Sequence, residues 1–450
     1  MFTKNVPHEK VNNYQPDLLS CQKTELVSSN FATNDDAVSS ILSPRDMSSL
    51  MLPRSDDYPS IPQDPKNPIT AEKVQLGQLL FHESRLGQTP KQQQGLHTYS
   101  CATCHHAEAG FQSGMSQAIS EGGNGFGVTG ELRIPSPLYS TANLDVQPIR
   151  TPTVLNTAYS EVILWNGSLG GTGVNLGTEA NWKVSDGTNN NFLGMQGLEG
   201  GGVAALKKHR LTPDTVWLAS VPEYKNLFDL AFPDVPEAQR VSSLNVSLAM
   251  AAYQRTLLPN EAPFQKYLQG DPRAMTADQV AGMNLFFGKA KCAKCHNGPS
   301  LGTVQFFALG MADMQQGVFG AVNIAPGNTE SKGRGGFTGK AADLYKFKVP
   351  QLYNLKDAGF YGHGGNFTSI EQVIRYINTA VPQNANVPAT QLAKQFVPLN
   401  LNDDEIAKLV AFVKDALYDP NLSRYAPASL PSGDCIPNND AQSKIDRGCQ

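Results

Sequence analysis

The sequence predicts a mainly α-helical protein with long loops, built from two domains that are related by an internal repeat. Three observations lead to this fold class. Apolar residues recur at helical spacing in several segments, strand patterns are weak throughout, and three short motifs recur in the same order in both halves. Hydrophobic residues make up 40% of the 450 residues and charged residues 17%, which is typical of a globular chain.

Four segments carry the clearest helical signals, because apolar side chains recur there every three to four residues. Two of them begin with a capping box, in which a polar residue is followed three positions later by Glu or Gln. These two helices are predicted to start after Thr276 and after Asn402. The other two are predicted over 71–83 and 242–257.

The internal repeat depends on three landmarks. In each half a Gly-x-x-Leu-Phe segment precedes a close pair of cysteines, and a segment with a central Pro and a final Asn follows that pair. Nine residues beyond this Asn stands an aromatic residue, and a Gly follows it two positions later. The landmarks are 77–81, 150–156 and Trp165 in the first half, and 282–286, 348–354 and His363 in the second.

These landmarks divide the chain into four parts. We predict an N-terminal extended arm over 1–65, a first domain over 66–265, a second domain over 266–425 and a C-terminal tail over 426–450. In the tail, Cys435 and Cys449 bracket a segment rich in Pro, Asn and Asp. The sequence allows two alternatives here, a disulfide between these cysteines or two free thiols.

The two remaining cysteine pairs carry the chemistry. Residues 101–105 (Cys101, Cys104, His105) and residues 292–296 (Cys292, Cys295, His296) both read C-x-x-C-H, the attachment signature of haem c. Two cysteines three apart can form thioethers with both vinyl groups, and the adjacent His then lies under the iron as an axial ligand. We therefore expect two cytochrome c-like haem domains with two covalently bound haem c groups.

Two other kinds of site use close cysteine pairs. A zinc site needs further ligands near each pair, and a thioredoxin-like redox pair needs a parallel α/β setting. The sequence indicates neither setting.

Location and partners follow from the same observations. Haem c is attached outside the cytoplasm, so we expect a periplasmic or otherwise exported protein, although the N-terminus carries no visible signal-peptide pattern. No apolar stretch is long enough to span a membrane. With a net charge of -4 and no Lys/Arg-rich run, nucleic acid is not an expected partner.

The chain resembles the superfamily of bacterial di-haem cytochrome c peroxidases and MauG over roughly residues 70–420. Several short motifs together carry this resemblance. They are Leu79-Leu80-Phe81, Cys101 to His105, Arg150 to Asn156, Leu164 to Gly167, Gly197-Leu198-Glu199, Cys292 to Gly298 and Tyr361 to Gly365.

The resemblance implies roles for the site residues. The haem on His105 would react with hydrogen peroxide, and the haem on His296 would be six-coordinate and pass electrons. Trp165 would lie between the two haems and couple them, the alternative being an ordinary core Trp. Glu199 would be the acid–base group over the peroxide-reactive haem, the alternative being an exposed loop Glu.

Two positions depart from the family pattern. Ala142 stands where the peroxidase branch carries a distal His, which favours the MauG-like branch. Ile377 stands where the sixth ligand of the second haem is expected. The neighbouring Tyr376 is the candidate ligand, and Met311, Met314 and a five-coordinate iron are the alternatives.

The resemblance also implies a calcium ion between the two domains. Arg150 stands where the Asn ligand of that ion is expected, and this substitution speaks against calcium in this chain.

The leading hypothesis is a di-haem c-type peroxidase that reduces hydrogen peroxide with electrons from a small cytochrome or cupredoxin. A MauG-like enzyme that uses peroxide to oxidise residues of a partner protein is the first alternative. A non-catalytic electron-transfer cytochrome would need both irons saturated by side chains, and two such ligands are not evident. A haem-based binding or sensing module is the remaining alternative.

Overall fold

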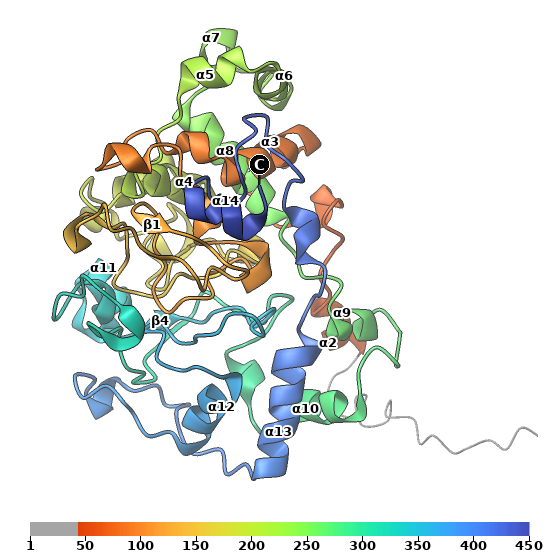
Figure 1. Cartoon of the computed structure of the whole chain (residues 1–450). Coiled ribbons are helices and arrows are strands. Elements are labelled where there is room, and N and C mark those ends of the chain that lie inside the picture. Colours follow the sequence, from red (N-terminus) through yellow and green to blue (C-terminus); the bar gives the residue numbers. More distant parts are fainter. Residues whose placement is uncertain (1–43, 450) are drawn as a thin grey trace, which may run out of the picture.

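The computed structural model describes residues 44–449, which form a mainly helical molecule with very little sheet (Figure 1). Cys21 and most of the predicted arm lie outside the described residues. The α-helices are α2 (Pro44–Ser49), α3 (Ala71–His82), α4 (Gly197–Lys208), α5 (Thr215–Ser220), α6 (Pro222–Ala231), α7 (Glu237–Arg240), α8 (Ser243–Arg255), α9 (Pro263–Leu268), α10 (Ala277–Phe287), α11 (Arg334–Thr338), α12 (Ile370–Thr379), α13 (Asp403–Ala411) and α14 (Ala441–Arg447).

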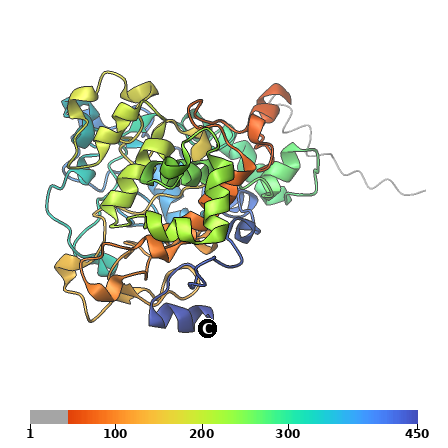
Figure 2. The ribbon, with the colours of Figure 1, turned by 90° about the horizontal axis from the view of Figure 1, so that it is seen from above.

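Two short antiparallel strand pairs account for the sheet among these residues. The strand β1 (Gly123–Asn124) pairs with β2 (Ile134–Pro135), and β3 (Phe306–Phe307) pairs with β4 (Phe347–Lys348). Long loops with single 3₁₀ turns connect the helices, and α5 to α7 lie at one end of the molecule (Figures 1 and 2). The prediction of a mainly α-helical fold with long loops is therefore confirmed.

The four predicted helices correspond to α3, α8, α10 and α13. Both capping boxes are present, because the side chains of Thr276 and Asn402 accept from the backbone N–H three residues later and the Gln and Glu there bond back. Helix α13 passes directly into a π-helical turn over Phe412–Ala416, so its apolar stripe continues.

Each of two helix crossings requires a glycine. Helix α3 lies against α8 at Gly77, where a Cβ atom would overlap the carbonyl of Ala249. Helix α10 lies against α13 at Gly282, where a Cβ atom would overlap the carbonyl of Lys408. Any larger residue would push these helices apart.

Two large hydrophobic cores surround these crossings. The first core contains buried side chains of α3, α6 and α8, together with Leu422 and Tyr425 from near the C-terminus. The second contains buried side chains of α9, α10 and α13, together with Leu50 and Leu52. The described part of the predicted arm is thus packed into the second core, where Gln265 bonds to the main chain of both leucines.

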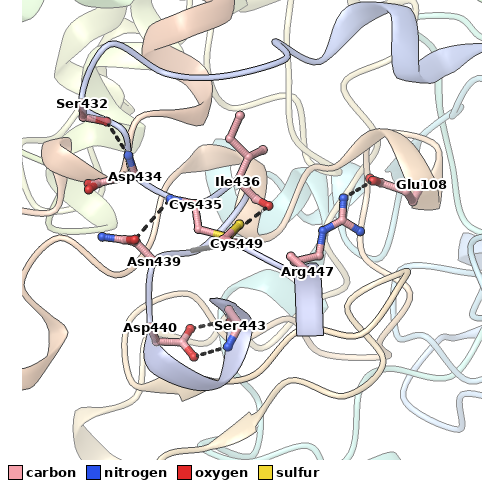
Figure 3. The surroundings of a disulfide bond; sticks show 10 residues. All are labelled: Glu108, Ser432, Asp434, Cys435, Ile436, Asn439, Asp440, Ser443, Arg447 and Cys449. Carbon is pink, nitrogen blue, oxygen red and sulfur yellow. Dashed lines mark hydrogen bonds and ion pairs between the residues drawn. A yellow bond between two sulfur atoms is a disulfide. The ribbon is translucent and has the colours of Figure 1, made fainter. Parts of the chain in front are cut away.

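The C-terminal tail returns to the first half of the molecule. A disulfide joins Cys435 to Cys449 with a Cα–Cα distance of 5.8 Å, which settles the alternative left open by the sequence (Figure 3). Asp440 at the start of α14 pairs with Arg133 at 3.1 Å, and Arg447 at its end pairs with Glu108 at 2.8 Å.

No helix among residues 44–449 has the length and apolar character needed to cross a membrane.

The tail disulfide gives a first testable prediction. The variant Cys435→Ser/Cys449→Ser should lose about 3 kcal/mol of stability, because the cross-link no longer restricts the unfolded chain. Urea unfolding should show a lower midpoint than the native protein. A reductant should lower the native midpoint to that of the variant and leave the variant unchanged. Equal midpoints without reductant would contradict a stabilising role for the disulfide.

Candidate active site

Both C-x-x-C-H motifs face one large cavity. Its volume is about 1330 Å³, and its lining includes all four cysteines and both histidines of the motifs. Pockets for a single small ligand usually measure about 300–1,000 Å³, so this cavity has room for more than one group. The first cysteine of each pair begins a short 3₁₀ turn, Cys101–Thr103 in the first half and Cys292–Lys294 in the second, and the second cysteine directly follows that turn.

The two motif imidazoles are held in the same way. His105 donates from Nδ1 to the carbonyl of Phe111 at 3.3 Å, and His296 donates from Nδ1 to the carbonyl of Leu301 at 3.0 Å. The lone pair of each ring is then on Nε2. Burial lowers the pKa of His105 to about 4 and also lowers the pKa of His296. Both rings are therefore neutral at pH 7, the state in which imidazole binds a metal.

The motif cysteines are not activated thiols. Burial raises the pKa of Cys101, Cys104 and Cys292 to about 12, whereas redox-active pairs depend on a lowered thiol pKa. Among residues 44–449 there is also no group of three or more His, Cys, Asp or Glu that could hold a metal. The geometry fits haem c instead, since each motif offers two thiols and one neutral imidazole to a single large cavity.

Trp165 lies at the junction between the two halves. Its indole Nε1 donates to the carbonyl of Arg150 at 2.7 Å, and its own carbonyl accepts from the backbone N–H of Lys348 at 2.7 Å. Its ring stands edge-on to the ring of His363, with centroids 6.4 Å apart, and it lines the same cavity as both motifs. Trp165 thus contacts residues of both halves, and its role in coupling two haems stays a prediction.

Comparisons with known proteins agree with this geometry. The family model described as di-haem cytochrome c peroxidase matches residues 71–273. The methylamine utilization protein MauG of Methylorubrum extorquens is 29% identical over 364 residues, which are 80% of this chain and 82% of that protein. The cytochrome c551 peroxidase of Pseudomonas aeruginosa is 26% identical over 348 residues, 77% of this chain and 79% of that protein.

The chain is therefore similar to bacterial di-haem cytochrome c peroxidases and to MauG over about four fifths of its length, and the family model matches residues 71–273. The chain is accordingly an oxidoreductase of the di-haem peroxidase class. The crystal structure of a MauG-like protein associated with microbial copper homeostasis shares the fold, with a TM-score of 0.58 at 23% identity, covering 84% of this chain and 97% of that one.

Glu199, the acid–base group expected from the superfamily, is not brought to the cavity. Its neighbours Leu198 and Gly201 line the cavity, but its carboxylate is fully buried elsewhere. Arg255 on α8 donates to both carboxylate oxygens, from Nε at 3.0 Å and from a terminal nitrogen at 2.8 Å. Glu199 is therefore neither an exposed loop residue nor a side chain facing the motif histidines.

Tyr376, the candidate sixth ligand of the second haem, does not line the cavity either. Its hydroxyl donates to the carbonyl of Leu309 at 2.6 Å, and its ring packs between Phe367 and Phe396. The next residue, Ile377, lines the cavity in its place. Of the two alternative methionines, Met311 lines the cavity whereas Met314 is buried outside the lining.

A paired imidazole in the cavity was not anticipated from the sequence. His209, at the end of α4, lines the cavity, and its Nδ1 is hydrogen-bonded to a carboxylate oxygen of Asp145 at 2.9 Å. His105 lines the same cavity, and burial is the main cause of its low pKa. No motif signals this pair, because 64 residues separate its members.

The burial of the Glu199–Arg255 pair gives the second prediction. Glu199→Gln should destabilise the protein by about 3–5 kcal/mol, because it leaves the Arg255 charge buried without its partner. The double variant Glu199→Leu/Arg255→Met should lose less stability than the single one, as measured by urea unfolding. A Glu199→Gln variant of native stability that has lost peroxide turnover would instead support the acid–base role.

Proposed function

We propose that this chain reduces hydrogen peroxide to water with electrons from a small redox protein, using haem c groups attached at residues 101–105 and 292–296. In the reaction, the O–O bond breaks as two electrons and two protons enter, giving two waters. The observation that carries the proposal is the single cavity that both motifs face, whose lining also includes Trp165. Haem iron bound there would supply the redox centre.

The attachment residues are assigned by their chemistry. Cys101 and Cys104 would form the thioethers of the first haem, and Cys292 and Cys295 those of the second. The Nε2 atoms of His105 and His296 would bind the two irons, since their Nδ1 atoms are already hydrogen-bonded to carbonyl oxygens. This second hydrogen bond fixes the orientation of each ring.

We also propose that the two halves, 66–265 and 266–425, are related domains. Supporting observations occur in pairs. Phe81 and Phe286 each lie 6.5 Å from the motif imidazole of their own half. Asn156 and Asn354 both have a positive φ, and each donates its backbone N–H to a leucine carbonyl at 3.0 Å. The accepting residues are Leu257, just after α8, and Leu417, just after the π-helical turn that follows α13. The glycine at each helix crossing adds a third pair.

His209 is proposed as the proton-handling group. Heterolytic cleavage of peroxide needs a group that accepts a proton from one oxygen and delivers it to the other. Through Nδ1, Asp145 holds the His209 ring in place, and the ring lies in the cavity wall. Since the carboxylate of Glu199 is already engaged by Arg255, this pair is the better candidate.

Met311 is proposed as the sixth ligand of the second haem. It lines the cavity, and a Cβ atom at Gly362 would be 3.5 Å from its sulfur, so the thioether lies beside the turn at Gly362 and His363. Thioether sulfur is an established axial ligand of c-type haem.

The remaining proposals concern the cellular location and the redox partner. Haem c attachment implies an exported, periplasmic protein, and a small cytochrome or cupredoxin is the proposed electron donor. The MauG-like alternative, oxidation of a partner protein, is supported by the residue type at position 142, where Ala142 stands in place of the distal His of the peroxidase branch. Relatives named cytochrome c peroxidase favour the first version.

Peroxide titration of the purified holoprotein is the direct test, and it is the third prediction. The mass should exceed that of the polypeptide by two haems, and peroxide should be consumed with a reduced small cytochrome c as donor. Trp165→Phe should slow turnover while leaving the haem content unchanged. A protein that lacks haem, or whose oxidised irons are both low-spin and inert to peroxide, would contradict the proposal.

The His209–Asp145 pair gives the fourth prediction. His209→Gln should lower peroxide turnover by about 10²-fold or more, because the proton-transfer group is lost. Asp145→Asn should cause a smaller loss and shift the pH profile. Lys208→Gln is the matched control, since Lys208 also lines the cavity but carries no imidazole. Unchanged turnover and pH profile in His209→Gln would exclude the role.

A further inference from the structure

The guanidinium of Arg150 is buried in a shell of uncharged oxygens at the junction between the two halves. The residue is 2% exposed. One terminal nitrogen donates to the carbonyl of Met115 at 2.6 Å. The other donates to the carbonyls of Ser113 and Ala358, both at 2.9 Å, and to the side-chain oxygen of Gln112 at 3.2 Å. Three of these oxygens come from the first half and one from the second.

No carboxylate in the part of the chain that the structure describes forms an ion pair with this guanidinium. A buried charge without a counter-ion is costly unless hydrogen bonds replace its hydration, which is what the four oxygens do here. Burial lowers the pKa of Arg150 to about 10, so the group still carries its positive charge at neutral pH.

Carbonyl and amide oxygens are also the ligands that calcium uses in proteins. A calcium ion does not fit this cradle, because the guanidinium already uses its oxygens and would repel a second cation at contact distance. The divalent ion that the superfamily resemblance implies between the domains therefore has no place in this chain at Arg150.

The main chain of Arg150 is tied to the proposed electron bridge. Its N–H donates to the carbonyl of His363 at 2.8 Å, and its carbonyl accepts from the indole of Trp165 at 2.7 Å. The imidazole of His363 in turn stacks on Phe347, with ring centroids 3.7 Å apart. A side chain anchored on both halves thus fixes the backbone that holds both aromatic residues.

We propose that Arg150 is a built-in cation that takes the place of a divalent metal ion at the junction, and that it positions Trp165 and His363. The positioning part rests on the proposed function, because it concerns coupling between the two haem sites. The metal-replacement part does not, since it concerns only binding and stability.

The first experiment uses the holoprotein, calcium chloride and the chelator EGTA, with thermal unfolding as the readout. The unfolding temperature of the native protein should be the same with calcium and with EGTA. Arg150→Gln should unfold several degrees lower, and Arg150→Lys should recover part of that loss because it restores the charge. A lower unfolding temperature of the native protein in EGTA would overturn the replacement of the metal.

The second experiment measures coupling as the separation between the reduction potentials of the two haems. Arg150→Gln should change this separation, and Arg150→Lys should partly restore it. Arg334→Gln is the matched control, because Arg334 is also buried and its guanidinium also links the two halves. From the second half it donates to main-chain carbonyls of the first half, those of Asn166, Gly167 and Val174. It should lower stability without changing the separation.

The two parts of the proposal fail separately. If Arg150→Gln left the separation unchanged, or Arg334→Gln changed it equally, Arg150 would not be a specific positioning residue. If the native protein did not turn over peroxide at all, the proposed function would fail, while the calcium and EGTA comparison would still decide whether Arg150 replaces a metal.

Discussion

The rest of the site depends on one hydrogen bond that occurs in both halves, from the motif imidazole to a carbonyl five or six residues later. This bond turns Nε2 toward the cavity. In each case the accepting residue, Phe111 or Leu301, is fully buried and has a positive φ, a conformation that residues other than glycine rarely adopt. Such strain is retained only where surrounding packing imposes it, and here Phe111 is packed in the first hydrophobic core and Leu301 in the second.

Local signals made the helices and both motifs predictable from the sequence, whereas side-chain directions were not. Capping boxes act within four residues, so the helix starts at Thr276 and Asn402 followed from the chain alone. The direction of Glu199 depends instead on Arg255, which lies 56 residues away on another helix. Tyr376 differs from Ile377 by one helical position, or about 100° around the axis, and only the packed structure decides which faces the cavity.

Arg150 illustrates how one substitution changes the kind of constraint at a junction. A metal ion is exchangeable, and its hold on the two halves depends on its concentration. A guanidinium is part of the chain, and its fork directs hydrogen bonds to several oxygens at fixed angles. The cost is burial of a charge, which the carbonyls of Ser113, Met115 and Ala358 offset through charge-assisted hydrogen bonds. The junction is thereby made permanent once the chain has folded.

The two C-x-x-C-H motifs share their local geometry, but the residues that hydrogen-bond to them lie at different separations along the chain. The second is held by nearby residues, such as Thr303, which donates to the carbonyl of Cys295 at 3.3 Å. The first is held by the tail, because Ser100 donates to the carbonyl of Pro437 at 2.9 Å and Thr103 bonds to Asn438. The disulfide closes this segment of the tail (Figure 3). The first motif is thus completed only by the far end of the chain, and this difference in support is in keeping with different roles for the two haem sites.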